Sequence, residues 1–295
     1  MTVGLNLDKR QRAMLREMGV RLWQPPPPAA QDIQVLQEAV REPAMAERVP
    51  AAARAVPAMP LAVPLVLAAV AQVLPLQGRP AGVDSMDWAT LQAAVAGCGA
   101  CSLCQSRTNS VFGVGPSGTA GPLPQVDWLV VGEAPGENED LAGEPFVGQA
   151  GKLLDNMLHA LQLQRGGEAA PRPGVARRVF ITNVLKCRPP GNRNPEAAEL
   201  AQCEPYLKRQ VELLQPKIIL ALGKFAAQSL LQDSVPEVQK IPLGKLRGQV
   251  HRYLGVPVVV TYHPAYLLRS LPDKAKAWDD LCLAASVAPT IVRSA

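Results

Sequence analysis

The sequence lacks a hydrophobic run long enough to cross a membrane. Its most apolar stretch, residues 61–74, is interrupted by Pro64 and is shorter than the roughly 20 apolar residues that a spanning helix needs. The N-terminal residues MTVGLNLDKRQR contain no apolar core of the kind found in signal peptides. We therefore expect a cytoplasmic protein with no membrane partner.

Histidine and excess charge are also scarce. The chain has 3 His residues, and its 30 Lys and Arg against 25 Asp and Glu give a formal net charge of +5. This mild basicity permits a polyanionic partner without requiring one. His159 falls in a predicted helix and His251 precedes a predicted strand, so we interpret both as structural or surface residues and keep His263 as a site candidate.

Six cysteines stand out against this background. In a cytoplasmic protein, cysteines are more often metal or cluster ligands or core residues than disulfides. Cys98 and Cys101 form a CxxC pair, which lets two thiolates bind one centre from a tight turn, and Cys104 extends the pair. Cys187 and Cys203 follow without repeating the CxxC spacing, which argues against a zinc ribbon. Spacing alone leaves both zinc and an iron–sulfur cluster open.

Composition divides the chain into three zones. Residues 1–23 contain a short amphipathic helical pattern that ends at Trp23. Residues 24–84 are rich in Pro and Ala and contain no aromatic residue, which is typical of a flexible linker. Residues 85–295 have the composition of a globular domain.

The globular zone alternates strand-like and helix-like segments. The predicted strands are short, apolar and β-branched: 127–131, 179–184, 217–222 and 256–261. The predicted helices between them are 149–163, 196–214 and 224–231. This alternation favours an α/β fold with a parallel sheet covered on both faces. Polar residues follow every strand, and in such sheets ligands bind beyond the carboxyl ends of the strands.

Three long motifs resemble one family. They read GEAPGENEDLAGEPFVGQAG from residue 132, ITNVLKCRPPGNRNP from residue 181 and TYHPAYLLR from residue 261. In this order they are similar to the signature regions of family 4 uracil-DNA glycosylases, and the similarity covers residues 95–284. It implies a three-layer αβα fold with a central four-stranded parallel sheet. It also implies a 4Fe–4S cluster on Cys98, Cys101, Cys187 and Cys203, with Cys104 left over.

The resemblance assigns roles around a uracil flipped out of DNA. Phe146 offers a stacking face, and the amide of Asn183 distinguishes uracil from cytosine by its donor and acceptor pattern. His263 donates a hydrogen bond to the departing base, and Glu133 orients or activates the attacking water. Ala134 presents backbone groups, and Glu139 excludes the methyl group of thymine, whereas Asp140 only holds its loop.

A second set of residues is predicted to bind the DNA itself. The segment 266–269 resembles an insertion loop whose apolar side chains fill the space left by the flipped base, with an arginine for phosphate or the unpaired partner base. Other basic residues are candidate phosphate contacts. The predicted DNA-binding residues are Arg188, Arg193, Tyr266, Leu267, Leu268 and Arg269, and Lys245 and Arg247 are further phosphate candidates.

The predicted function is hydrolysis of the N-glycosidic bond of deoxyuridine in DNA, carried out by a monomer. One alternative is the related group that becomes covalently trapped on uracil-DNA, which carries a Gln in the first turn and a basic insertion; both are missing here. Another is a non-catalytic iron–sulfur subunit of the replication machinery, which need not keep Phe146, Asn183 and His263. Residues 5–23 are similar to the N-terminal peptide of the DNA polymerase III psi subunit, which implies docking to a protein associated with the replication clamp loader.

Overall fold

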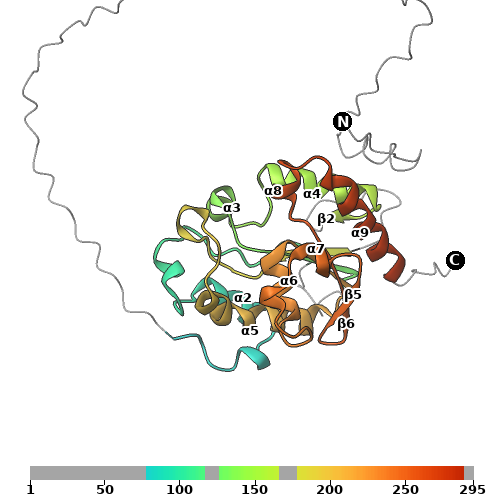
Figure 1. Cartoon of the computed structure of the whole chain (residues 1–295). Coiled ribbons are helices and arrows are strands. Elements are labelled where there is room, and N and C mark those ends of the chain that lie inside the picture. The colour runs from blue at the N-terminus through green and yellow to red at the C-terminus, as the bar shows by residue number, and fades with distance from the viewer. Residues whose placement is uncertain (1–77, 117–125, 166–177, 289–295) are drawn as a thin grey trace, which may run out of the picture. The chain divides into compact units, whose positions relative to one another are not determined.

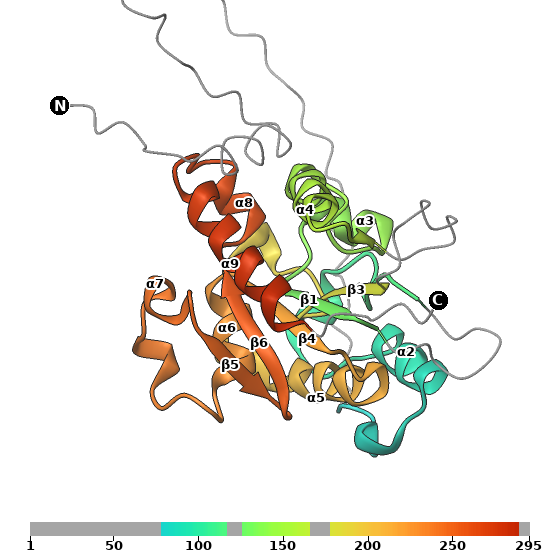
Figure 2. The same cartoon turned by 90° about the vertical axis from the view of Figure 1, so that its right-hand side faces the viewer.

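In the computed structural model, the four predicted strands form the centre of one sheet (Figures 1 and 2). The strand order is β2-β3-β1-β4-β6-β5, and every neighbouring pair is parallel except β5 with β6. The strands are β1 (Trp128–Gly132), β2 (Gln164–Arg165), β3 (Arg178–Asn183), β4 (Ile218–Leu222), β5 (Val250–Tyr253) and β6 (Val256–Thr261). The predicted four-stranded parallel core is confirmed, and two edge strands extend it.

Those two edge strands carry no clear signal in the sequence. β2 is only two residues long, and β5 is half exposed, with Val250 facing solvent. β5 turns back into β6 through Leu254 and Gly255, both with positive φ, which is typical of a tight hairpin. A strand exposed on one face needs no continuous apolar run, so β5 lacks the sequence signal of a buried strand.

Helices cover both faces of the sheet. The helices are α2 (Trp88–Ala96), α3 (Glu137–Ala142), α4 (Gln149–Ala160), α5 (Ala197–Leu214), α6 (Lys224–Leu231), α7 (Leu243–Leu246), α8 (Pro264–Leu267) and α9 (Asp273–Val287). Short 3-10 turns lie at Val83–Ser85, Ser102–Gln105, Pro190–Asn192 and Val238–Lys240. One apolar core joins the sheet to α2, α5 and α6, and a second joins its other face to α4 and α9. Figure 2 shows the sheet between these two helical layers.

The structure describes residues 78–116, 126–165 and 178–288. The predicted helix of residues 1–23 and most of the predicted linker lie outside these ranges. The core begins before residue 85, because Val83 is buried against it and the 3-10 turn at Val83–Ser85 contacts α5. Within these ranges, no helix is long and apolar enough to span a bilayer.

Candidate active site

The carboxyl ends of the central strands bring the motif residues together. Gly132 of β1 lies in register with Asn183 of β3, and the pairing continues past the strand as the Leu185 N–H donates to the Glu133 carbonyl over 3.0 Å. A cavity of about 530 Å³ opens at this edge of the sheet. Its walls come from the loops that follow β1, β3 and β6.

All six residues predicted for the base pocket line this cavity: Glu133, Ala134, Glu139, Phe146, Asn183 and His263. Of the predicted DNA-binding residues, Arg193, Tyr266 and Arg269 also line it. Arg188, Leu267 and Leu268 do not. Residues as far apart as 133 and 269 therefore contribute to a single surface.

Asn183 is buried, and its amide oxygen is unpaired among the described residues. The side chain is 2% exposed, and its Oδ1 has no hydrogen-bond partner among the described residues. A buried polar atom of this kind is costly unless a ligand satisfies it. The Asn183 backbone carbonyl accepts a hydrogen bond from Lys186 Nζ over 2.7 Å, which fixes the segment from the other side.

Gly132 sets the space between Asn183 and Phe146. A Cβ atom at this position would collide with Asn183 Oδ1 and lie 2.5 Å from Phe146 Cζ. Even an alanine methyl group would therefore displace one of these two side chains. The absence of a side chain at the end of β1 allows the amide and the ring to line the same cavity.

Phe146 and His263 make a direct aromatic contact. Their ring centroids lie 5.5 Å apart with an interplanar angle of 30°. His263 Nδ1 accepts a hydrogen bond from the Ala265 N–H over 3.2 Å, so in the neutral ring the proton lies on Nε2. Burial, with a smaller effect from Arg269, lowers the pKa of His263 to about 4. The imidazole is therefore neutral at physiological pH and can donate through Nε2.

Glu133 has a partly buried carboxyl group without an internal partner. Among the described residues, no hydrogen bond or ion pair engages this carboxyl group. Burial raises its pKa to about 7. A carboxylate with a pKa near the working pH is suited to accept a proton from water.

Glu139 lines the cavity and also holds two loops together. Its carboxylate accepts hydrogen bonds from the backbone N–H groups of Gly136, Val147 and Gly148 over 3.0–3.1 Å. These contacts tie the turn after β1 to the loop that carries Phe146. Asp140 accepts from the Thr108 N–H and so joins its helix to the preceding segment.

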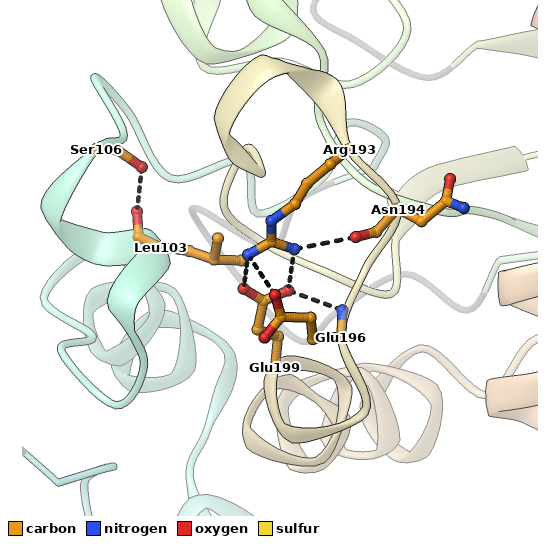
Figure 3. A network of polar contacts seen from close by, with 6 residues as sticks. All are labelled: Leu103, Ser106, Arg193, Asn194, Glu196 and Glu199. Atoms are coloured by element: carbon orange, nitrogen blue, oxygen red, sulfur yellow. Dashed lines mark hydrogen bonds and ion pairs between the residues drawn. The ribbon is translucent and has the colours of Figure 1, made fainter.

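Two predicted DNA contacts need correction. Leu267, the last residue of α8, is fully buried in the core, so it cannot insert into DNA. Leu268, 44% exposed, and Tyr266, 38% exposed, face solvent. Arg193 reaches the cavity, but its guanidinium pairs with both carboxylate oxygens of the buried Glu199 at 2.5 and 3.0 Å (Figure 3). The arginine therefore anchors its loop to the start of α5 and has few donors left for phosphate.

The other basic candidates differ in their availability. Arg188 donates to Asn192 Oδ1 over 2.8 Å and lies 3.5 Å from a carboxylate oxygen of Glu137. Arg247 forms an ion pair with the buried Asp280 at 2.7 Å and lies over the Tyr262 ring, so its role is structural, contrary to our expectation. No carboxylate in the described ranges pairs with Arg269 at the rim of the cavity.

The cysteines line a second cavity directly behind the first. Its walls include all four predicted ligands and Cys104: Cys98, Cys101, Cys104, Cys187 and Cys203. None of these five forms a disulfide. Burial raises the pKa of Cys187 to about 11 and that of Cys203 to about 12. No group of three or more His, Cys, Asp or Glu side chains within the described ranges is arranged to hold a metal ion.

Two residues at the cysteine cavity were missed by the sequence analysis. Arg107 donates to Cys187 Sγ over 2.9 Å and to the Ala96 carbonyl over 2.7 Å. Lys186 is fully buried, and its ammonium group donates to Thr182 Oγ1, Gln210 Oε1 and the Asn183 carbonyl over 2.6–2.7 Å. Lys186 directly precedes Cys187, so the sequence could have placed it near the cysteine cavity. Arg107 lies 80 residues from Cys187, so nothing in the local sequence indicates their contact.

Comparison with known proteins agrees with this geometry. Residues 119–282 match the family model described as "Uracil DNA glycosylase superfamily". The chain is 42% identical over 177 residues to the Type-4 uracil-DNA glycosylase of Sulfurisphaera tokodaii, covering 59% of this chain and 72% of that protein. It is 39% identical over 202 residues to the Type-4 uracil-DNA glycosylase of Pyrobaculum aerophilum, covering 67% of this chain and 93% of that protein. The chain therefore belongs to the uracil DNA glycosylase superfamily.

Proposed function

We propose that this protein is a DNA repair enzyme that hydrolyses the N-glycosidic bond of deoxyuridine in DNA. Uracil leaves and an abasic site remains. The observation that carries the proposal is the buried, unpaired amide oxygen of Asn183 in a cavity shared with Glu133, Phe146 and His263. The relatives named Type-4 uracil-DNA glycosylase support the same reaction.

Asn183 selects the base. Uracil presents an N3–H donor beside the O4 acceptor, and a fixed side-chain amide complements this pair by accepting at Oδ1 and donating from Nδ2. Cytosine presents an acceptor and a donor in these positions, so it would leave buried groups unpaired. The 5.5 Å spacing between the Phe146 and His263 rings is that of a direct contact, so the base lies against this pair rather than between the rings.

His263 stabilises the leaving group. As the C1′–N1 bond breaks, its electron pair passes to the base, and negative charge develops on uracil O2. The neutral imidazole donates its Nε2–H to this oxygen without transferring a net charge, which is the electrostatic stabilisation that preorganised donors provide. Its low pKa keeps the ring neutral over the whole physiological range.

Glu133 prepares the water. The sugar becomes positively charged at C1′ as the base departs, and a carboxylate nearby stabilises that charge. The same carboxylate accepts a proton from the water that attacks C1′. Both roles need the ionised form, and a pKa of about 7 makes that form abundant only above neutral pH.

The rim of the cavity would bind the DNA. Arg269 offers a cation that no carboxylate of the described residues pairs with, and the exposed side chains of Tyr266 and Leu268 lie beside it in the sequence. These residues remain the candidates for phosphate contact and for filling the space of the flipped base. Arg188 contributes from the loop after β3, where it donates to Asn192 and forms an ion pair with the exposed Glu137.

We propose that the cysteine cavity is the site of a 4Fe–4S cluster. Five thiols surround one space, a guanidinium donates to one of them, and thiolate ligands bound to iron are deprotonated despite burial. Cys98, Cys101, Cys187 and Cys203 would hold the cluster, which, when bound, cross-links the segment before β1 to the loop after β3. We expect Cys187→Ala to lose iron and Cys104→Ala to retain it, as measured by iron content and visible absorbance. Equal iron loss in both variants would contradict this ligand set.

Four finer expectations stay predictions. Docking of residues 5–23 to a replication protein concerns residues outside the described ranges. The cytoplasmic location and the monomeric state are likewise predictions, as is the division of the chain at residues 23 and 84.

The test is direct. The full chain is incubated with single-stranded and paired oligonucleotides that contain one uracil, and abasic sites are measured by strand cleavage in alkali. We expect abasic sites with uracil and none when cytosine or thymine replaces it. Binding without uracil release would favour the non-catalytic DNA-binding alternative instead.

A further inference from the structure

The backbone of Phe146 adopts an unfavourable conformation. Its φ angle is 57°, in the left-handed region that bulky side chains rarely adopt. Such a conformation persists only where surrounding contacts hold it, and these outliers gather at functional sites. Phe146 lines the cavity, so the contacts that hold its backbone also determine where its ring lies.

Arg165 supplies those contacts from outside the cavity. Its Nη1 donates to the Pro145 carbonyl over 2.7 Å, and its Nη2 donates to the Phe146 carbonyl over 2.9 Å. The planar guanidinium thus binds two consecutive carbonyl groups through two donors held in a rigid fork, a geometry that the single nitrogen of a lysine does not reproduce. Arg165 itself does not line the cavity.

The guanidinium is in turn held by its neighbours. Arg165 Nε donates to Asp155 Oδ1 on α4 over 3.0 Å, and the backbone of Arg165 belongs to β2, which pairs with β3. Figure 1 shows α4 and β2 close together, in agreement with their contacts. The arginine side chain is 19% exposed, so water competes little for these bonds.

Helix α4 closes the turn from the other side. A Cβ atom at Gly151 would collide with the Phe146 carbonyl oxygen, so the helix approaches this carbonyl as closely as the chain allows. The carbonyl is therefore fixed between a helix backbone and a bidentate donor. The strained turn has no freedom to relax while both contacts remain.

We propose that Arg165, oriented by Asp155, is a positioning residue that holds Phe146 in the strained conformation needed to receive the base. The inference rests on the proposed function, because it takes Phe146 as the surface on which uracil stacks. Without the bidentate contact, the turn relaxes towards right-handed φ values and the ring leaves the cavity wall. His263 then loses its aromatic neighbour as well.

The test is a double-mutant cycle on the full chain. We expect Arg165→Gln to slow single-turnover uracil release about tenfold in the wild-type background and to have almost no effect in the Phe146→Ala background. Arg165→Lys should restore little, since its single nitrogen lacks the rigid two-nitrogen fork of the guanidinium. Arg252→Gln is the matched control: Arg252 donates to the Gly255 carbonyl in the distant β5–β6 hairpin.

A second readout does not depend on turnover. The NMR signals of the His263 ring, which lies against Phe146, should shift in Arg165→Gln in the same direction as in Phe146→Ala and stay unchanged in Arg252→Gln. Should Arg165→Gln not fold, Asp155→Ala, a half-exposed helix position, replaces it in both experiments.

The outcomes are distinct. Unchanged His263 signals, or an equal loss of rate with and without the Phe146 ring, would overturn the positioning role. A wild-type chain that releases no uracil would overturn the proposed function, and the NMR comparison would still decide whether Arg165 positions Phe146.

Discussion

At the scale of single residues, the pocket depends on polar groups that the fold leaves unpaired. Within the part of the chain that the structure describes, Asn183 Oδ1 is buried without a partner, and no residue pairs with the Glu133 carboxyl group. Both arrangements cost folding free energy. Because the fold would be more stable with these groups paired, their state points to a ligand that completes them.

The Asn183 amide can be tested by Asn183→Asp. The carboxylate cannot donate to uracil O4 and introduces a buried charge, so we expect uracil release to fall roughly 10- to 100-fold. Any activity on cytosine should rise relative to uracil, because an aspartic acid can present the complementary pattern. The measurement is single-turnover release from matched uracil and cytosine oligonucleotides. Asn194→Asp, at an exposed position near the cavity, serves as control; unchanged selectivity in Asn183→Asp would remove the amide from base recognition.

The Glu133 carboxyl group predicts a pH profile. Because the ionised form acts and the pKa is about 7, the rate should rise with pH through about 7 and then level off. No fall is expected from His263, which stays neutral above about pH 4. Single-turnover rates from about pH 5 to about pH 9 check this, and a rate that declines above neutrality would instead indicate an acid with a raised pKa.

The same residue links activity to stability. The folded-state pKa lies above the ordinary 4.5, so the buried carboxylate destabilises the fold increasingly as the pH rises from about 4.5 to about 7. Glu133→Gln should therefore melt at a higher temperature than the wild type above neutral pH, yet release uracil about 100-fold more slowly or worse. A lower melting temperature above neutral pH would show that the carboxylate is stabilised by its surroundings.

At the scale of secondary-structure elements, the last residue of α8, Leu267, and the residue that follows the helix, Leu268, have opposite surroundings. Leu267→Ala should destabilise the fold by about 2–5 kcal/mol because it opens a cavity in the core. Leu268→Ala should leave the melting temperature nearly unchanged and slow release of uracil from duplex DNA more than from single strands. Thermal unfolding and paired activity assays separate the two effects. Comparable destabilisation by both would mean that Leu268 also supports the fold.

This pair of leucines also shows where sequence reasoning ends. The segment 256–261 is a strand with the predicted bounds, and helix 224–231 agrees as well, because buried apolar runs and amphipathic periods are local signals. The TYHPAYLLR motif locates the loop but does not show which of its two leucines is buried. That depends on the apolar core formed with α4 and α9, against which Leu267 packs.

The sequence likewise does not predict which groups the charged residues pair with. Arg193, Arg247 and Arg165 look alike in the sequence, as exposed basic residues near motifs. Each is committed to a carboxylate or carbonyl group, and the Arg247 partner Asp280 lies 33 residues away. Their pairing follows from tertiary packing, which periodicity does not report.

At the scale of the whole molecule, the described part of the chain begins within the predicted linker. A chain that starts at Gly78 should fold and release uracil like the full protein, since it retains the buried Val83. A chain that starts at Ser85 loses this side chain and should be less stable by about 1.5–3 kcal/mol. Chemical denaturation of the two truncated chains tests the difference. Equal stability of the two truncated chains would mean that the globular domain begins at residue 85, as the sequence predicts.

The base cavity and the cysteine cavity share a wall. Asn183 lines the first, Lys186 and Cys187 line the second, and Ala134 borders the first while packing against the cysteine side. Whatever the thiols bind therefore lies next to the segments that carry Ala134 and Asn183. Substitutions at positions 134 or 183 that aim at a new base preference will therefore also alter the packing around the cysteine cavity. Such a design has to treat the base cavity and the cysteine cavity together.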